Sequence, residues 1–266
     1  MKIFLLCNSQ SNQIALANKI HKKFNLDKIF VWKKKKKFNF LNFKNFFNHL
    51  FTFFKFRNSW INMLKYYEKE HKDFLLRPSL VTDDINSQDL KEFIIKDKPD
   101  LVLVSGTNLL KKELIDLINI NGKIMNLHTG ISPYVKGGPN CTNWCLFMNK
   151  FYLIGNTVHW IDEGIDSGDI ISTKQADLIG KENLNDLHVK VMESAHNLFI
   201  NSIDFYLKNK NINSINQSDF EDKKLFKTND WKLYNMIIAL YNFYFNYNEN
   251  KIKKNDIILI NLKSEN

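Results

Sequence analysis

The 266-residue chain contains little glycine, proline or cysteine, and each shortage limits what the protein can be. Nine glycines and four prolines leave little room for long flexible linkers. The three cysteines, Cys7, Cys141 and Cys145, include no C-x-x-C pair, and their odd number argues against a disulfide framework. No histidine or acidic residue accompanies Cys141 and Cys145 at ligand spacing, so no metal site is predicted. Cys7, close to the start, is predicted to lie in the core.

Long apolar runs and the common nucleotide-binding motifs are also missing. The apolar opening of the chain is shorter than the core of a secretion signal, and no run reaches the length of a membrane-spanning helix. The sequence contains no G-x-G-x-x-G, no G-x-x-x-x-G-K-[ST] and no G-x-S-x-G. These absences argue against a dinucleotide fingerprint, a P-loop and a hydrolase nucleophile elbow. The sequence therefore predicts a soluble, cytoplasmic protein.

Positive charge is concentrated in one segment. The chain carries 38 Lys and Arg against 28 Asp and Glu, a net charge of +10. Residues 22–57 hold eleven of the basic residues and one acidic residue, Asp27. The net charge of this segment is therefore equal to the net charge of the whole chain. The rest of the chain is close to neutral, which argues against a uniformly basic surface for nucleic acid.

Residues 33–67 combine the lysines with a high density of phenylalanine, nine of them between Phe38 and Phe56. One helical stripe is formed by Phe40, Phe43, Phe47, Leu50, Phe54 and Ile61. This spacing predicts an amphipathic helix packed on the sheet beside a solvated lysine run. The alternative is a helix on an anionic membrane surface, a peripheral contact through residues 33–61, because cationic flanks and exposed Phe suit an interface. Nucleic-acid binding is a third interpretation.

The order of apolar runs predicts an α/β fold. Residues 2–7 and 26–32 have strand character and flank a helical pattern over 12–23, as in a parallel sheet. Further strands are predicted at residues 101–104, 123–125, 155–161, 170–174 and 256–262, and helices at 87–96, 109–118, 185–208 and 231–247. The expected architecture is a Rossmann-like, mostly parallel, twisted sheet with flanking helices and a small C-terminal appendage.

Asn126-Leu127-His128 is the strongest candidate for chemistry. It follows a short strand, at the edge where open α/β sheets bind ligands, and alternation along an extended chain points Asn126 and His128 to the same side. An amide donor beside an imidazole suits stabilisation of an oxyanion, with the imidazole available for proton transfer. A carboxylate from a separate loop could raise the pKa of that imidazole, fix its tautomer and order a water.

Three further motifs follow in order: Pro133-x-x-Lys136-Gly137, Thr157-x-His159 and Asp166-x-Gly168. In this order and spacing the set resembles the formyltransferase family, whose members include the glycinamide ribonucleotide, methionyl-tRNA and sugar-nucleotide N-formyltransferases. The resemblance is strong over residues 99–171 and weaker over 1–23. It implies transfer of a formyl group from 10-formyltetrahydrofolate to an amine, without a metal.

The resemblance also implies roles for individual residues. The catalytic Asn, His and Asp of the family fall on Asn126, His128 and Asp166. The pterin-binding loop would be formed by Trp160, Ile161, Asp162, Glu163, Gly164 and Ile165, and the opposite wall by Ser105, Gly106 and Thr107. The substrate loop would contain Ser132, Pro133, Tyr134, Lys136 and Gly137. His159, in an apolar strand, is instead predicted to be a structural histidine whose hydrogen bonds are satisfied.

The acceptor amine is less constrained. The glycinamide ribonucleotide enzymes carry a glycine-rich phosphate loop after their first strand, where this chain has Asn8-Ser9-Gln10-Ser11-Asn12. Methionyl-tRNA formyltransferases add a C-terminal β-barrel, for which the short tail leaves too little room. Elimination of these two acceptors, together with the sequence of residues 128–134, favours the primary amine of an amino sugar on a nucleotide or lipid carrier. The expected partner is therefore a small molecule, a nucleotide sugar, rather than nucleic acid.

Residues 1–208 are predicted to form the catalytic domain, with 33–67 as a basic, Phe-rich helical insertion and 209–266 as an extension without an assigned role. Two interpretations from other classes stay open. One is hydrolysis of the same formyl donor, which needs only water in place of the amine. The other is a folate-binding module without turnover, against which the presence of all of Asn126, His128 and Asp166 argues.

Overall fold

The computed structural model describes residues 1–33, 46–138, 140–253 and 257–264, with the side chains of the second helix described from residue 54 onward. The strands are β1 (Ile3–Asn8), β2 (Lys28–Trp32), β3 (Leu80–Thr82), β4 (Leu101–Ser105), β5 (Lys123–His128), β6 (Lys136–Gly137), β7 (Gly155–Trp160), β8 (Ile170–Gln175) and β9 (Leu225–Phe226). The helices are α1 (Ser11–Phe24), α2 (Phe46–Glu68), α3 (Gln88–Asp97), α4 (Lys112–Asn119), α5 (Cys141–Phe147), α6 (Leu184–Asn209), α7 (Leu233–Asn246) and α8 (Glu249–Ile252). Short 3₁₀ turns occur at Phe151–Leu153, Gln217–Asp219 and Thr228–Asp230.

Seven of these strands form one twisted sheet in the order β3-β2-β1-β4-β5-β7-β8. The strands β3, β2, β1, β4 and β5 run parallel, whereas β7 is antiparallel to both of its neighbours, β5 and β8. The predicted α/β class with a mostly parallel sheet is confirmed. The change from parallel to antiparallel pairing falls on β5, the strand that carries Asn126 and His128.

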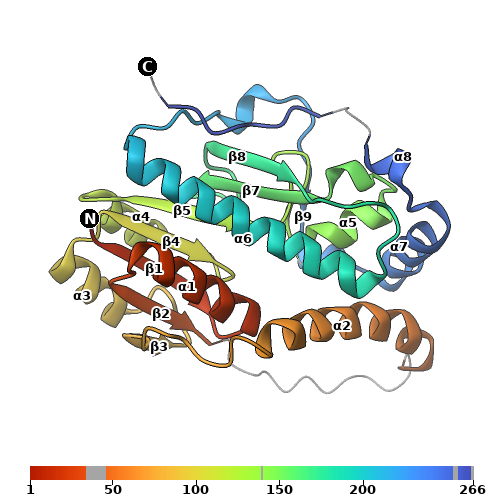
Figure 1. Cartoon of the computed structure of the whole chain (residues 1–266), viewed down its shortest axis with the longest axis horizontal. Coiled ribbons are helices and arrows are strands. Elements are labelled where there is room, and N and C mark those ends of the chain that lie inside the picture. The colour runs from red at the N-terminus through yellow and green to blue at the C-terminus, as the bar shows by residue number, and fades with distance from the viewer. Residues whose placement is uncertain (34–45, 139, 254–256, 265–266) are drawn as a thin grey trace.

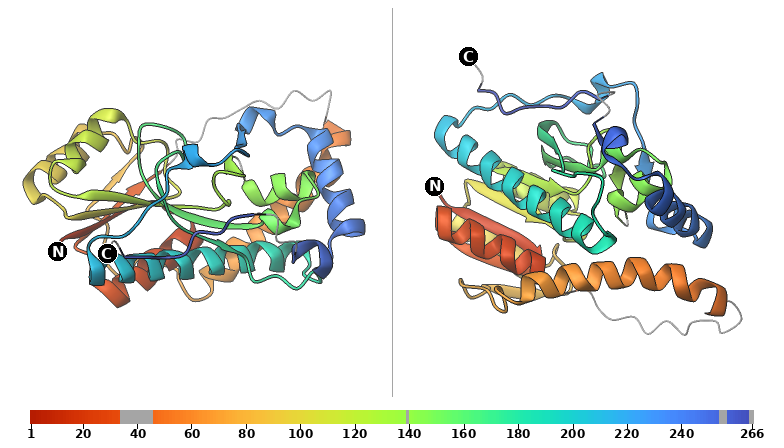
Figure 2. Two further views of the ribbon diagram at one scale, coloured as in Figure 1. Left: turned by 90° about the horizontal axis from the view of Figure 1, so that it is seen from above. Right: turned by 45° about the vertical axis from the view of Figure 1, so that its right-hand side comes forward.

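Helices cover both faces of the sheet (Figures 1 and 2). On one face, Leu5 and Cys7 of β1 pack with α1 and α6, so Cys7 is in the core as predicted. On the other face, Phe4 and Leu6 pack with α3 and α4. Because side chains alternate along a strand, β1 supplies both cores. A third cluster, centred on α5 and α7, extends the core beyond the sheet.

The second helix differs from its predicted packing. α2 contacts α6, α1 and α7, so it lies chiefly on helices. Its buried face contains Phe56, Ser59, Met63 and Tyr67, whereas Phe54 and Ile61 of the predicted stripe are half-buried. The other members of that stripe (Phe40, Phe43, Phe47 and Leu50) and most of the lysine run lie outside the described side chains. Within the described stretches, no helix is both long and apolar enough to cross a bilayer.

Residues 257–262 form no strand, so that part of the predicted strand at 256–262 is wrong. The segment touches the sheet edge at one point, where Ile260 exchanges hydrogen bonds of 2.8 Å with the backbone N–H and the hydroxyl of Thr173 in β8. Ile260 is buried against Ile170 and Phe220. The apolar alternation therefore reflects anchoring of the tail by single side chains and not a continuous ladder.

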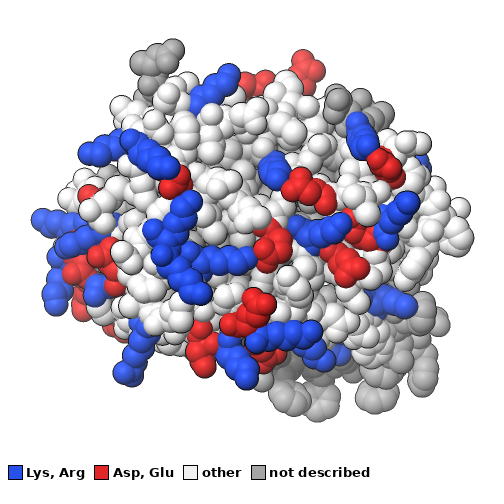
Figure 3. Space-filling view, viewed as in Figure 1, with Lys and Arg blue, Asp and Glu red and all other residues white. Residues whose placement is uncertain are grey.

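Charged side chains are mixed on the face that carries α1 and α6 (Figure 3). Lys19 of α1 pairs with Glu193 of α6 at 2.9 Å, and Lys23 with Asp204 at 3.7 Å. Basic and acidic groups of these two helices thus neutralise one another locally. This face presents no continuous basic surface of the kind that nucleic acid requires.

Candidate active site

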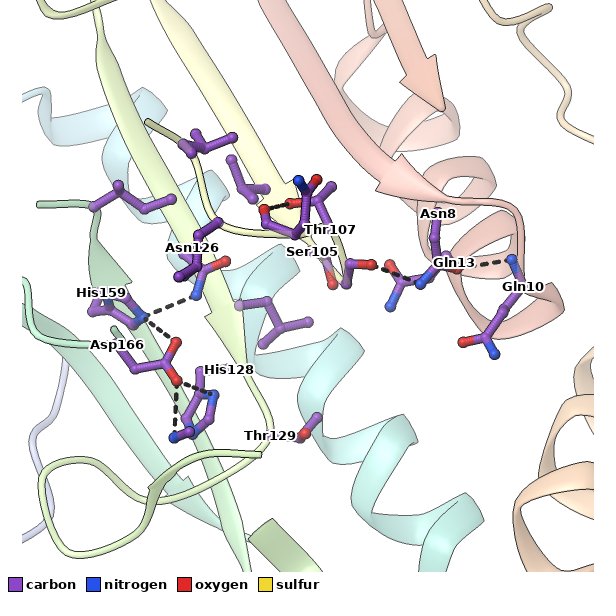
Figure 4. A pocket seen from close by; sticks show the side chains of 18 of the residues that line it. Asn8, Gln10, Gln13, Ser105, Thr107, Asn126, His128, Thr129, His159 and Asp166 are labelled. Carbon is purple, nitrogen blue, oxygen red and sulfur yellow. Dashed lines mark hydrogen bonds and ion pairs between the residues drawn. The ribbon is translucent and has the colours of Figure 1, made fainter. Parts of the chain in front are cut away.

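A cavity of about 340 Å³ lies at the carboxyl ends of β1, β4 and β5. Its walls come from the β1–α1 turn, the β4–α4 loop, the end of β5, and β7 with the loop that follows it (Figure 4). Loops at this edge of a parallel sheet approach one another without filling the space between neighbouring strands, which is why ligands bind there in open α/β folds.

Asn126 is held by His159 across the antiparallel pairing of β5 and β7. The two residues are register partners, and Asn126 Nδ2 lies 2.9 Å from His159 Nε2. His159 Nδ1 lies 2.6 Å from the carbonyl oxygen of Trp160, which can only accept, so Nδ1 carries a proton. With Nε2 unprotonated, the ring accepts from the Asn126 amide and so orients a side chain that lines the cavity.

His128 lies on β5, the strand that also carries Asn126, and its ring faces the Asp166 carboxylate (Figure 4). The distance from His128 Nδ1 to Asp166 Oδ2 is 3.3 Å, and His128 Nε2 lies 3.4 Å from the carbonyl oxygen of Val135. Cys141 Sγ is 3.5 Å from the same ring nitrogen. Both ring nitrogens of His128 therefore have a polar partner in reach: Nδ1–H can donate to Asp166, and Nε2 can either donate to Val135 or accept from the Cys141 thiol.

Asp166 sits in a left-handed backbone conformation, with a φ of 48°. Its Oδ2 accepts a 3.0 Å hydrogen bond from the backbone N–H of Gly137, and its Oδ1 lies 3.7 Å from His159 Nε2. A non-glycine residue in this region is strained and persists only when its surroundings hold it there. The carboxylate thus joins both histidines and the loop before α5 at one point.

The electrostatics of the pair are set by burial and by mutual attraction. Burial lowers the pKa of His128 below its ordinary value, and the Asp166 carboxylate opposes that shift without overcoming it. The predicted effect of a carboxylate from a separate loop, to raise the pKa of this imidazole, is therefore present, but burial outweighs it. Burial favours a raised pKa for Asp166, but His128, His159 and the Gly137 N–H outweigh it and hold the pKa well below its ordinary value. Asp166 is thus ionised throughout the physiological range.

Comparison with known proteins agrees with this geometry. A model of the formyl transferase family matches residues 1–203. The chain belongs to this family. It is similar to the methionyl-tRNA formyltransferase of Clostridium tetani, 29% identical over 60% of the chain and 51% of that protein. A second such relative, from Finegoldia magna, is 29% identical over 47% of the chain and 39% of its own length. The chain thus spans about half the length of the curated relatives it matches.

Solved formyltransferase structures share the fold. A sugar N-formyltransferase from a Shewanella species superposes with a TM-score of 0.58 at 14% identity, covering 100% of the chain and 98% of that structure. A 4-N formyltransferase from Francisella tularensis gives 0.54 at 19% identity, over 91% and 87% of the two chains. The phosphoribosylglycinamide formyltransferase of Anaplasma phagocytophilum gives 0.55 at 14% identity, over 86% and 98%. At these low identities the similarity establishes a shared fold and not a shared substrate.

Most residues assigned to the formyl donor by the family resemblance lie on the cavity wall. Ser105, Gly106, Thr107, Ile161, Asp162 and Gly164 line it. Three others are not part of the lining: Trp160 packs against Tyr206, Glu163 pairs with Lys112, and Ile165 is exposed. Their roles in donor binding stay predictions.

The residues assigned to the substrate loop are mostly engaged elsewhere. Gly137 lines the cavity, but Ser132 is buried and its N–H donates to Thr157 Oγ1 at 2.8 Å. Pro133 is buried beside it, and the Tyr134 hydroxyl accepts from the N–H of Ile258 at 3.1 Å. Lys136 Nζ lies 3.4 Å from Gln217 Oε1. The structure thus gives four of the five a supporting position near the site.

Two groups of site residues were not predicted from the sequence. His159, expected to be only structural, is indeed satisfied in its hydrogen bonds, yet it lines the cavity and contacts Asn126 and Asp166. The second group is a row of amides at the β1–α1 turn: Asn8, Gln10, Asn12 and Gln13. The polar run after the first strand was the available signal for them. Within the part of the chain that the structure describes, no group of three His, Cys, Asp or Glu residues could hold a metal.

Proposed function

We propose that this chain transfers a formyl group from 10-formyltetrahydrofolate to a primary amine. The observation that carries the proposal is the convergence of Asn126, His128 and Asp166 on one cavity, with His128 Nδ1 and Asp166 Oδ2 3.3 Å apart. Residues 1–208 would form the catalytic domain. The apolar lining residues Val104, Leu127 and Ile161 offer a surface for the flat pterin ring of the donor.

In the proposed reaction, the neutral amine attacks the formyl carbon and gives a tetrahedral intermediate. Asn126 and His128 both line the cavity. Asn126 donates an N–H to the oxyanion, and His128 exchanges its 3.4 Å contact with the Val135 carbonyl oxygen for the oxyanion. The bond from the formyl carbon to N10 of the donor then breaks, and N10 gains the proton that the amine loses. Asp166 remains ionised and supports a proton on His128 while negative charge develops beside it.

For the acceptor, we propose an amino sugar on a nucleotide or lipid carrier. Its support is the chemistry of the β1–α1 turn, where Asn8, Gln10, Asn12 and Gln13 line the cavity. Neutral amides pair with hydroxyl groups, while the described lining includes no Lys or Arg to neutralise a phosphate at that wall. The fold is compatible with this choice, since the sugar N-formyltransferase from a Shewanella species shares it over the whole chain.

A second candidate acceptor is methionyl-tRNA, because the curated relatives quoted above carry that name. The chain reaches only about half of their length, so the remainder of those proteins has no counterpart in the matched region. A transferase for methionyl-tRNA would need a basic surface near the cavity to bind phosphates.

The test is an acceptor screen with purified protein and 10-formyltetrahydrofolate, in which absorbance reports release of tetrahydrofolate. The panel contains amino-sugar nucleotides and methionyl-tRNA, and His128→Ala is run beside the wild type. We expect release that requires an amino-sugar nucleotide and is lost in His128→Ala. Release without any amine would replace the proposal by hydrolysis, and release with methionyl-tRNA alone would select the second candidate. Absence of both release and folate binding would overturn the activity altogether.

A further inference from the structure

The C-terminal segment reaches back to the loop that carries Asp166. Gln217 is almost fully buried, with 4% of its surface exposed. Its Nε2 donates to the backbone carbonyl oxygens of Asp166 at 2.7 Å and of Gly168 at 2.8 Å, and its Oε1 accepts from Lys136 Nζ at 3.4 Å. One side chain from outside the family match at 1–203 therefore ties both sides of the loop together.

The same segment also holds Gly137, whose backbone N–H donates a hydrogen bond to the Asp166 carboxylate. β9 pairs with β6, and the N–H of Gly138 donates to the carbonyl oxygen of Phe226 at 3.0 Å. Gly137 lies between these contacts with a φ of +89°, and a Cβ there would meet Phe226 O at 2.1 Å. Its N–H donates to Asp166 Oδ2. Residues 217 to 226 thus fix both the backbone of Asp166 and the partner of its carboxylate.

We propose that Gln217 is a positioning residue for Asp166, and that residues 217–226 complete the active site. The inference rests on the proposed function. Asp166 occupies a strained left-handed conformation, which requires external support. One hydrogen bond from Gln217 supplies that support at the carbonyl oxygen of Asp166 itself, and the other holds the carbonyl oxygen of Gly168 two residues later. Without them the carboxylate moves away from His128, and a displacement of about 1 Å in an active site can cost on the order of 100-fold in rate.

The test compares Gln217→Leu with Gln175→Leu. Gln175 also donates to a backbone carbonyl, that of Tyr152, at 2.8 Å, but on a different part of the sheet. Both variants lose an amide that donates to a backbone carbonyl, from a buried side chain at 217 and a half-buried one at 175, so Gln175→Leu reports the general cost of such a loss. We expect only Gln217→Leu to lower kcat, by about 10- to 100-fold, with the KM for the formyl donor changed less than about twofold.

A second measurement is independent of turnover. The Asp166 carboxylate raises the pKa of His128, so an NMR titration of the His128 ring should show a lower pKa in Gln217→Leu than in the wild type or Gln175→Leu. An unchanged His128 titration in a folded Gln217→Leu protein would overturn the proposal, as would equal effects of the two variants. If the wild type transfers no formyl group, the proposed activity fails while the titration still decides whether Gln217 positions Asp166.

A separate observation concerns the exposed face of α7. Tyr234, Ile237, Ile238, Tyr241, Tyr244 and Phe245 form a continuous helical stripe whose members are 40–75% exposed. None of the residues of α7 is charged. Figure 3 shows uncharged surface at the right-hand edge, where α7 lies. The opposite face of α7 is buried against α5 and α2 through Ala239, Leu240 and Phe243.

We propose that the α7 stripe is the contact surface between two copies of this chain. Four aromatic side chains of roughly 150–250 Å² each, more than half exposed, present on the order of 500 Å². Two stripes pairing about a twofold axis would bury about 1,000 Å² from these rings alone, which reaches the lower limit of about 1,000 Å² for a specific interface before Ile237 and Ile238 are added. Helices that bind anionic membranes instead carry many Lys and Arg, which α7 lacks.

Sedimentation equilibrium over a range of concentrations tests this pairing. The wild type should associate to a dimer in the micromolar range, and Tyr241→Glu, at the centre of the stripe, should remain monomeric. Tyr66→Glu is the matched control, because Tyr66 is an exposed tyrosine on α2, away from the stripe. A monomeric wild type, or a Tyr241→Glu protein that dimerises as well as the control, would overturn the proposal. Binding of a monomeric wild type to anionic vesicles, lost in Tyr241→Glu, would assign the stripe to lipid instead.

Discussion

The two ends of the cavity are built differently. At the catalytic end, Asn126, His128, His159 and Asp166 hold one another through short polar contacts, all of which have identified partners. At the amide end, Asn12 and Gln13 are buried, yet Asn12 Oδ1 and Gln13 Oε1 have no hydrogen-bond partner among the residues that the structure describes. Unpaired buried acceptors are costly and rare in native structures. The polar groups are therefore paired with one another at one end and left unpaired at the other, which is where we propose that the acceptor amine binds.

The largest effect is expected at the catalytic end from Asp166→Asn. The substitution removes the charge that supports a proton on His128 and should lower kcat by about 100- to 10,000-fold, the usual contribution of general acid–base groups. Donor affinity, measured by fluorescence titration, should change little. Asp169→Asn is the control, since Asp169 accepts from Asn216 Nδ2 at the same loop without facing His128. Similar losses in both variants would make the effect one of loop folding.

Asn126→Ala should come next, because it removes one proposed oxyanion donor. Such losses typically lower kcat on the order of 100- to 1,000-fold. His159→Phe tests the proposed orienting role at the same place: it deletes the acceptor that holds the Asn126 amide, so kcat should fall less than in Asn126→Ala. In the double variant the two losses should not add. Additive losses, from steady-state kinetics, would show that His159 acts independently of Asn126.

At the amide end, Gln13→Leu should affect the acceptor and spare the donor. If Gln13 forms a hydrogen bond with a hydroxyl group of the acceptor, the KM for the amine should rise about 10-fold in the variant, in line with one lost neutral hydrogen bond. The KM for 10-formyltetrahydrofolate should stay within about twofold. Ser9→Ala, in the same turn but outside the cavity lining, is the matched control. A parallel rise in both KM values would mean that the two ends of the cavity are not separable.

The smallest expected effect is the titration of His128. Its pKa in the folded wild type should lie below 6.5, because burial disfavours the charged ring. Folding therefore disfavours protonation of His128, and its contribution to stability is lost as pH falls through 6.5 toward the lowered value. In Asp166→Asn the pKa should fall further, since the carboxylate that raises it is gone. An NMR titration checks both directions, and a rise in the variant would contradict the assigned cause.

The sequence predicted the catalytic end far better than its surroundings. Asn126 and His128 share one side of β5 because a strand alternates, which is a local rule. His159 is predicted to be structural because it lies in an apolar strand, and its place opposite Asn126 could not be predicted because it depends on the antiparallel register of β5 and β7, 33 residues apart. Gln217 gave no signal at all, since its contact with Asp166 spans 51 residues and has no motif. The strand predicted at 256–262 was wrong over its described part because apolar alternation also occurs where single residues anchor a tail.

The contact between Gln217 and Asp166 has a consequence for the order of events during biosynthesis. Gln217 follows Asp166 by 51 residues, which corresponds to about 3–10 s of translation. During that interval the emerging polypeptide already contains Asn126, His128 and Asp166 but lacks the residue that secures the loop. The loop that carries Asp166 should therefore be held less firmly in the nascent chain until residues 217–226 have been made.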